Sequence, residues 1–261
     1  MKLLEAVRIS VGYEKSGAEI KLLEGIDLTL EDGETVSIVG ASGSGKTLTG
    51  YTLAGLIPPP LRVLSGIIRF QGMTLKSSYP TAWRDVRGKK IFMLFQSPAS
   101  ALNPVVCVRN QIAEILVDVK KVGRSLAMRR SNDLLEKVGM SAEKGNAFQF
   151  QLSGGMRQRV LIALAIALEP AVLIADEPAV GLDPIHQLEI LQILKNLSLQ
   201  HQMAMIVITH DLRIASFLTH RAIVMSQGRI LESGSIANLI QTPKHAFTRN
   251  LIDSLRFMEG I

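Results

Sequence analysis

One short stretch constrains the fold of this chain more than any other. It reads GASGSGKT, from Gly40 to Thr47. It directly follows a buried-strand pattern, TVSIVG, and precedes an expected helix over about 46–56. The spacing G-x-x-x-x-G-K-T is typical of a loop whose backbone N–H groups surround phosphates at the start of a helix. A strand, a glycine-rich loop and a helix in this order predict an α/β fold that binds a nucleotide.

The residue types in this loop suit phosphate chemistry. Lys46 is expected to reach the β- and γ-phosphates, and the hydroxyl of Thr47 is expected to bind Mg²⁺. A chance flexible turn is the alternative, but the preceding strand and the following helix argue against it. The predicted ATP-binding residues of this segment are Gly40, Ala41, Ser42, Gly43, Ser44, Gly45, Lys46, Thr47 and Thr49.

A second motif, VLIADEP, predicts hydrolysis as well as binding. Asp176 ends a short apolar strand, where a carboxylate is placed to hold Mg²⁺. Glu177 follows immediately and is predicted to orient and deprotonate the attacking water. Asp-Glu pairs also commonly cap helices. A buried strand that ends in both residues, in a chain with a phosphate-binding loop, favours ATP hydrolysis.

The composition narrows the class of protein. Of 261 residues, 47% are apolar, enough for a sizeable core, and the single cysteine, Cys107, excludes a disulfide framework. The charged N-terminal segment MKLLEAVRIS is no signal peptide, and Glu169 and Pro170 interrupt the apolar run over 160–175. The net charge of +6 fits a solvated surface, or nearness to anionic lipid or nucleic acid. We therefore expect a chain that is soluble or peripheral to a membrane.

The order of the expected elements predicts one domain over 1–261. The first 35 residues alternate as strands do, and the later alternation of strands and helices predicts a largely parallel sheet. RAIVMSQGRILESG predicts a hairpin, and IPPPLRVLSG predicts a loop. We expect an α/β core over about 1–97 and 169–240, an inserted α-helical subdomain over about 98–168, and a tail over about 241–261.

The segment LSGGMRQR places a serine and two glycines where a long apolar helix is expected to begin. Paired glycines there cost chain entropy unless something approaches the backbone closely. The segment matches the signature loop of the ATP-binding cassette (ABC) family of transporter ATPases, and the resemblance covers nearly the whole chain. It implies an ABC ATPase core with an N-terminal antiparallel β subdomain, and two cassettes that pair head to tail. The residues implied to face the partner's ATP are Ser153, Gly154, Gly155 and Met156.

The resemblance also implies roles for single residues elsewhere. Tyr13 matches the aromatic that stacks on adenine, and Gln96 matches the glutamine that touches Mg²⁺ and water. Asp183 matches an aspartate that crosses the dimer interface, and His210 matches the histidine that contacts the γ-phosphate. The implied catalytic residues are Glu177, His210 and Lys46, and the implied Mg²⁺ ligands are Thr47, Gln96 and Asp176. The remaining histidines, which we predict to be surface residues, are His186, His201, His220 and His245.

Departures from the family pattern point to one branch. Met156 stands where glutamine is common, and Ala179 and Val180 stand where paired threonines are usual. The methionine, the segment FQSPASALNP and the tail TPKHAFTRNL resemble the peptide and nickel importer ATPases. The tail, the short C-terminus and the lack of added cysteines look most like the nickel-type subunit. Nickel or a nickel chelate is therefore the expected cargo, and di- or oligopeptides are the alternative.

The resemblance implies partners and a location. The partners are a second, non-identical ABC ATPase subunit, two integral membrane permeases and an extracytoplasmic solute-binding protein. The location is the cytoplasmic face of the inner (plasma) membrane, as a peripheral protein. A nucleic-acid-associated ABC ATPase and a P-loop kinase or switch protein are the competing classes. The nucleic-acid class lacks support because no long coiled-coil insertion or basic linker is present, so no nucleic acid is expected as a partner. The signature loop argues against a kinase or switch protein.

Overall fold

The computed structural model describes residues 1–75 and 80–259. The chain divides into two compact units. Unit 1 comprises Met1–Arg87 together with Ala204–Ile261, and unit 2 comprises Gly88–Met203. The predicted helical subdomain, 98–168, lies within unit 2, which also includes 88–97 and 169–203. The last two residues of the predicted tail lie outside the described residues.

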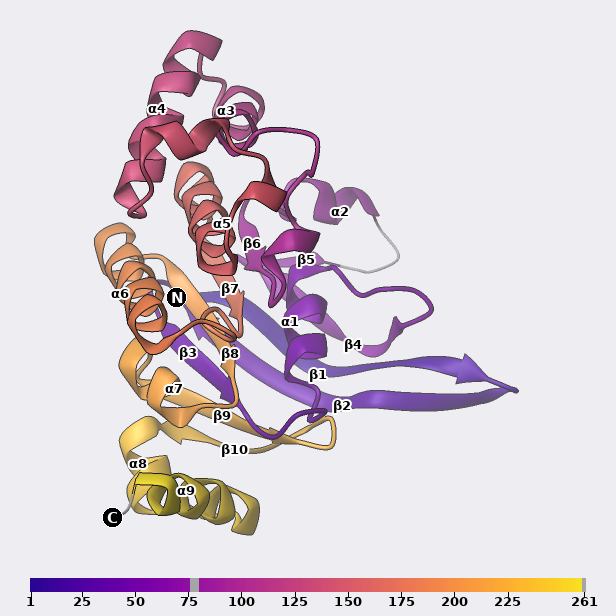
Figure 1. Ribbon diagram of the computed structural model, residues 1–261. Coiled ribbons are helices and arrows are strands. Elements are labelled where there is room, and N and C mark those ends of the chain that lie inside the picture. Colours follow the sequence, from indigo (N-terminus) through magenta and orange to yellow (C-terminus); the bar gives the residue numbers. More distant parts are fainter. Residues whose placement is uncertain (76–79, 260–261) are drawn as a thin grey trace. The chain divides into compact units, whose positions relative to one another are not determined.

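A four-stranded antiparallel sheet forms the N-terminal part of unit 1, with its long β1–β2 ribbon in indigo in Figure 1. Leu28 and Leu30 are buried on β2 while Thr29 between them is exposed, as strand alternation requires. The loop predicted for IPPPLRVLSG is wrong from Arg62 onward, because Arg62 and Val63 pair with the distant strand β1. In the order β2-β1-β4-β5, the strands span Ala18–Glu31, Lys2–Lys15, Arg62–Phe70 and Met73–Leu75.

A second set of strands in unit 1 runs in the order β10-β9-β3-β8. Strand β3 is parallel to both β8 and β9, while β10 is antiparallel to β9. The predicted hairpin is confirmed, and its turn residues Gln227 and Gly228 have φ of 49° and 73°, as a two-residue turn of this hand needs. The strands span Thr35–Val39 (β3), Ala204–Thr209 (β8), Arg221–Ser226 (β9) and Arg229–Ser235 (β10). The helices are α1 (Lys46–Ala54), α2 (Pro80–Arg84) and α7 (Leu212–Leu218).

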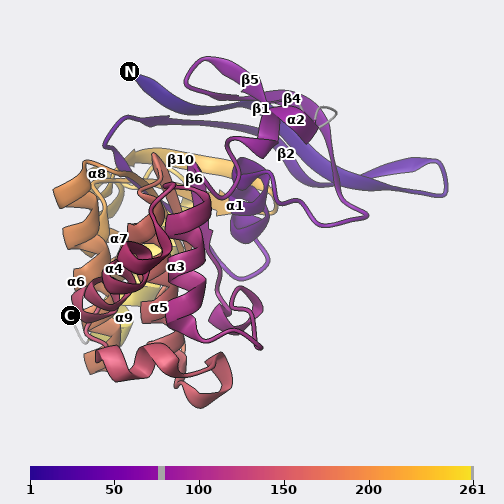
Figure 2. The ribbon, with the colours of Figure 1, turned by 90° about the horizontal axis from the view of Figure 1, so that it is seen from above.

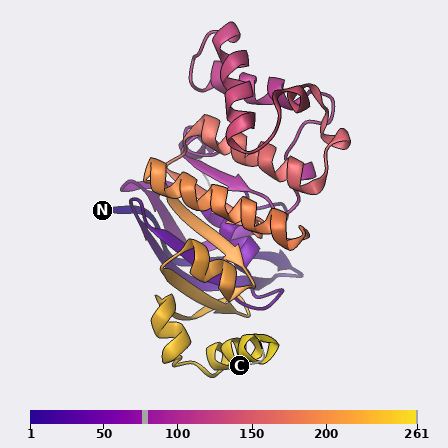
Figure 3. The same cartoon turned by 60° about the vertical axis from the view of Figure 1, so that its left-hand side comes forward.

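Two helices end the chain in unit 1, α8 (Ile236–Gln241) and α9 (Ala246–Glu259), drawn in yellow in Figure 3. The side chain of Ile252 on α9 is buried in one apolar cluster with Val39 and Val224 of the strands and Leu212 of α7. Burial of this kind, more than helix propensity, holds a surface helix in place.

Unit 2 consists of two parallel strands and a group of helices, and it includes the helical subdomain predicted over about 98–168. Figure 2 shows α3, α4 and α5 lying together, and they are in contact. The strands are β6 (Ile91–Leu94) and β7 (Val172–Asp176). The helices are α3 (Val108–Asp118), α4 (Arg124–Lys137), α5 (Gly154–Leu168) and α6 (Pro184–His201), with 3-10 turns at Pro98–Ser100, Ala142–Asn146 and Gln149–Gln151. Within the described parts of both units, no helix is both long enough and apolar enough to cross a bilayer.

Candidate functional site

The phosphate loop leaves β3 and enters α1 through a backbone that requires glycine. Gly43 and Gly45 have φ of 76° and 99°, in the left-handed region that other residues rarely adopt. At Gly40, a Cβ atom would strike the carbonyl oxygen of Met225 and lie 2.9 Å from Ser44 Oγ. The sequence spacing of the glycines is therefore explained by the path of the chain.

Lys46 is the first residue of α1, and its side chain folds back over this loop. Its Nζ atom donates hydrogen bonds to the carbonyl oxygens of Gly40 and Ala41, each at 2.9 Å. The residue is only 7% exposed. A buried ammonium group and the N-terminus of a helix both place positive charge at the loop, so the loop favours an anion.

Thr47 and Thr49 follow Lys46 on α1 and differ in their surroundings. Thr47 is half-buried directly after the phosphate loop, and the binding of its hydroxyl to Mg²⁺ stays a prediction. Thr49 is buried, and its Oγ1 atom donates to the carbonyl oxygen of Gly45 at 2.9 Å. This bond directs the Thr49 hydroxyl to the helix backbone, while a direct role in ATP binding stays a prediction.

Tyr13 and His210 also lie in unit 1. Tyr13 is half-buried on β1 and pairs with Ile20 of β2. His210 is exposed directly after β8, and Asp211 beside it caps α7 by accepting a bond from the Arg213 N–H at 2.8 Å. Burial raises the pKa of the Asp211 carboxyl, but bonds from the Arg213 side chain and backbone outweigh it and hold that pKa below its ordinary value.

The acidic pair lies in unit 2, at the end of β7. Asp176 is fully buried as the last residue of the strand, and Glu177 is half-buried. Glu177 has a φ of 46°, a left-handed conformation that is strained for a residue with a side chain. Strain of this kind is found where a side chain must point in a direction that a relaxed backbone does not provide. Gln96, also in unit 2, is exposed two residues after β6.

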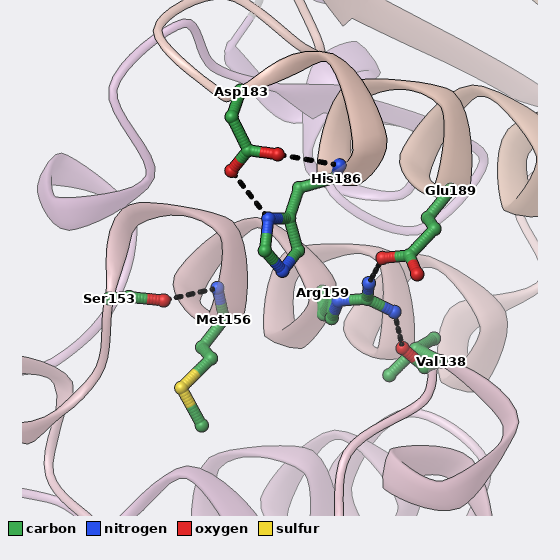
Figure 4. Close-up of polar contacts among 7 residues, drawn as sticks. All are labelled: Val138, Ser153, Met156, Arg159, Asp183, His186 and Glu189. Carbon is green, nitrogen blue, oxygen red and sulfur yellow. Dashed lines mark hydrogen bonds and ion pairs between the residues drawn. The ribbon is translucent and has the colours of Figure 1, made fainter.

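The signature segment forms an exposed helix start. Ser153 is the N-cap of α5, and its Oγ atom accepts a bond from the Met156 N–H at 3.3 Å (Figure 4). Ser153 and Gly154 are exposed, and no atom lies within 4 Å of where a Gly154 Cβ would be. Apart from the Met156 N–H, which Ser153 holds, the exposed start and the lack of a side chain at Gly154 let another molecule approach the backbone here.

Asp183 forms a second exposed helix start in unit 2, at the N-cap of α6. Its Oδ1 atom accepts from the His186 N–H at 3.2 Å, and its Oδ2 atom lies 2.5 Å from His186 Nδ1 (Figure 4). The side-chain bond with His186 is the main cause that lowers the pKa of the Asp183 carboxyl. His186 is exposed, as predicted, but its contact with Asp183 was missed. The spacing Asp-x-x-His across a helix start would have indicated it.

The predicted residues therefore gather in two groups. The phosphate loop, Tyr13 and His210 belong to unit 1, and the signature segment and Asp183 belong to unit 2, with Gln96, Asp176 and Glu177. Apart from Tyr13, which is paired within β1, these residues lie near the ends of strands or the starts of helices, where backbone groups are left for ligands.

Comparison with known proteins identifies relatives along nearly the whole chain. The family model described as ABC transporter matches residues 23–180. The oligopeptide transport ATP-binding protein OppD of Bacillus subtilis is 39% identical over 262 residues, which cover 99% of this chain and 73% of OppD. The dipeptide transport ATP-binding protein DppD of Escherichia coli is 37% identical over 257 residues, which cover 98% of this chain and 79% of DppD.

A solved structure shares the fold. It is the dimeric, post-hydrolysis structure of the ATP-binding cassette MJ0796 bound to ADP and Pi, with a TM-score of 0.80 and 25% identity. The match covers 90% of this chain and 99% of the MJ0796 chain. It confirms the predicted fold class, a P-loop NTPase core with an N-terminal antiparallel β subdomain and a helical insertion.

Proposed function

This chain belongs to the ABC transporter family, whose ATPases couple ATP hydrolysis to transport, and we propose that it powers the import of di- or oligopeptides. Import, the cargo and the partners are the proposed parts of this statement. ATP binding and hydrolysis follow from the family and from the phosphate loop.

The geometry at the start of α1 is the observation that supports ATP binding, on which the proposed import depends. A glycine-dependent loop, a buried ammonium group and a helix N-terminus all meet there. A polyanion is the ligand that this combination favours, and the β- and γ-phosphates of ATP provide it. Lys46 would exchange its bonds to the carbonyl oxygens of Gly40 and Ala41 for bonds to phosphate oxygens.

The other site residues are assigned by resemblance. Thr47, Gln96 and Asp176 carry hydroxyl, amide and carboxylate oxygens, the donor types that Mg²⁺ takes. When bound, Mg²⁺ neutralises charge on the phosphate oxygens. Glu177 accepts the proton of the attacking water, His210 contacts the γ-phosphate, and Tyr13 stacks on adenine.

The signature segment is proposed to act on a nucleotide held by another cassette. Its exposed serine and glycine backbone at the start of α5 support this role, because they can approach an anion outside their own unit. Asp183, at the exposed start of α6, is proposed to contact the same partner cassette.

Peptide cargo is favoured over nickel. The relatives OppD and DppD are named for oligopeptide and dipeptide transport, and they match this chain along nearly its whole length. The features that favoured nickel, among them the resemblance of the tail and the lack of added cysteines, offer no chemical route from this chain to a metal. The proposed partners are two integral membrane permeases and an extracytoplasmic solute-binding protein, with this chain bound at the cytoplasmic face of the membrane.

Uptake in a gene-deletion strain tests this proposal. We expect the strain to lose growth on a peptide as its nitrogen source and to keep normal radiolabelled nickel uptake at limiting concentration. A wild-type copy should restore growth, and a Lys46→Ala copy should not, because the ammonium charge on the phosphates is lost. Nickel uptake that falls while peptide use is unchanged would show that the cargo is nickel.

A further inference from the structure

Arg159 of α5 links three elements of unit 2. One guanidinium nitrogen donates to the carbonyl oxygen of Val138, at the end of α4, at 2.6 Å, and another forms an ion pair with Glu189 of α6 (Figure 4). The Arg159 side chain is only 12% exposed, so it depends on these partners. Gly139 leaves space for it, since a Cβ at that residue would lie 2.6 Å from the guanidinium.

The position of this ion pair relative to the two helix starts is informative. Arg159 lies six residues after Ser153, and Glu189 lies six residues after Asp183. Six residues correspond to about 9 Å along a helix. The ion pair therefore joins α5 and α6 at the same distance along each helix from its exposed start.

The same two segments also approach each other closely at their starts. A Cβ atom on Gly155 would lie 3.4 Å from a methyl carbon of Leu182, the residue before Asp183. Two helices that approach closely at their starts and are joined by an ion pair about 9 Å further along have little freedom to change the angle between them. We infer that the Arg159–Glu189 ion pair is a positioning pair that holds the signature turn, 153–156, and the Asp183 turn, 182–186, as one rigid body.

Hydrogen exchange of the isolated chain tests this inference without any partner. Glu189→Gln removes the charge and keeps the shape of the side chain. We expect the amides of both turns to exchange about 3- to 10-fold faster, the effect of losing roughly one ordinary hydrogen bond in a local opening, because Glu189 is half exposed. Amides in α3 should be unchanged.

Glu169→Gln provides a matched control. Glu169 lies at the other end of α5 and pairs with Lys120 at 2.9 Å, so the same substitution there breaks an ion pair of the same helix. It should leave both turns as in the wild type. Unchanged exchange in Glu189→Gln, or an equal increase throughout unit 2, would overturn the inference.

The consequence for activity rests on the proposed function, since both turns are proposed to meet the partner cassette. In the transporter purified with its partners, Glu189→Gln should lower kcat severalfold and leave ATP binding by the isolated chain unchanged. Normal turnover of Glu189→Gln with faster exchange would remove only this consequence. Normal turnover of Lys46→Ala would instead remove the proposed function and leave the exchange result standing.

Discussion

At the scale of single residues, Glu177 combines a proposed chemical role with a strained backbone. A residue with a Cβ in the left-handed region costs about 1–2 kcal/mol, which glycine avoids. We expect Glu177→Gly to be more stable than Glu177→Ala by about 1 kcal/mol in urea unfolding, because both lose the same side chain and only one relieves strain. An alanine variant of equal or greater stability would show that this backbone is relaxed.

Glu177→Gly and Glu177→Ala should also hydrolyse ATP slowly. Removal of a general base typically costs about 10²–10⁴-fold in rate. Glu177→Gln, which keeps the shape of the side chain, should bind ATP normally and hydrolyse it with a loss in this range in single-turnover measurements. Turnover within a few-fold of wild type would place the base on another residue.

Asp211 gives a prediction with a defined pH dependence. Its pKa is lowered in the folded state, so its stabilising contribution is present above the ordinary aspartate value of about 3.9 and is lost as the pH falls through the lower folded value. Asp211→Asn keeps an N-cap but loses the Arg213 ion pair. The variant should be less stable by about 0.5–1 kcal/mol at pH 7, a small value because the arginine is exposed, and the difference from wild type should shrink as the pH falls below about 3.9.

A double-mutant cycle identifies the partner in this effect. In an Arg213→Gln background, Asp211→Asn should leave the free energy of unfolding at pH 7 nearly unchanged. If Asp211→Asn still lowers stability in that background, or if its effect on stability does not change with pH, the helix cap alone accounts for the loss of stability.

The sequence predicts local contacts of residues well and tertiary contacts poorly. The glycines of the phosphate loop and the cap at Ser153 follow from spacing and from backbone needs, and the structure has both. Arg159 and Glu189 are thirty residues apart in sequence and lie on different helices, so no local pattern indicates their ion pair. The contact between His186 and Asp183 is local, but the search for functional histidines did not look for capping partners.

At the scale of elements, α9 depends on its apolar face and on the segment before it. The Glu232 carboxylate of β10 accepts bonds from the N–H groups of Lys244 and His245, at 2.9 and 3.0 Å, just ahead of α9. Ile252 lies 4% exposed in the apolar cluster beneath. The helix is therefore fixed at its start and along one face.

Truncation of that face should detach the helix. Ile252→Ala leaves a cavity that we expect to cost about 2–4 kcal/mol. Trypsin cleavage after Arg249 should become faster as α9 opens more often, while Leu199→Ala, at a 70% exposed apolar residue of α6, should change nothing. An unchanged cleavage rate in Ile252→Ala would show that α9 is held by other contacts.

Elements with a strong period were predicted, and those set by pairing partners were not. The apolar strands β3 and β7 and the helices α1 and α5 were expected from apolar runs and from the motifs beside them. Strand β4 was missed at its start because Pro58–Pro60 favoured a loop and the pairing partner of Arg62, Gly12, is fifty residues away. At this segment, long-range strand pairing outweighs the local preference for a loop.

At the scale of the whole molecule, the chain carries one phosphate loop and one signature turn, proposed to act on different ATP molecules. One cassette then completes no site by itself, and two cassettes complete two. Met156 and the resemblance to importers with two different cassettes led us to predict that the partner is a non-identical subunit.

Purification tests this prediction directly. The chain expressed alone should be mostly monomeric in light scattering and slow in hydrolysis, because no partner supplies a signature turn to its ATP. When tagged and purified from the source membrane, it should bring down a second ATPase of different sequence, and turnover in that complex should depend on Lys46 of this chain. A Ser153→Ala variant, which weakens the α5 cap by about 1 kcal/mol, should lower turnover in the complex and leave the slow rate of the isolated chain unchanged. Recovery of a homodimer that drives transport fully would show that this chain pairs with itself.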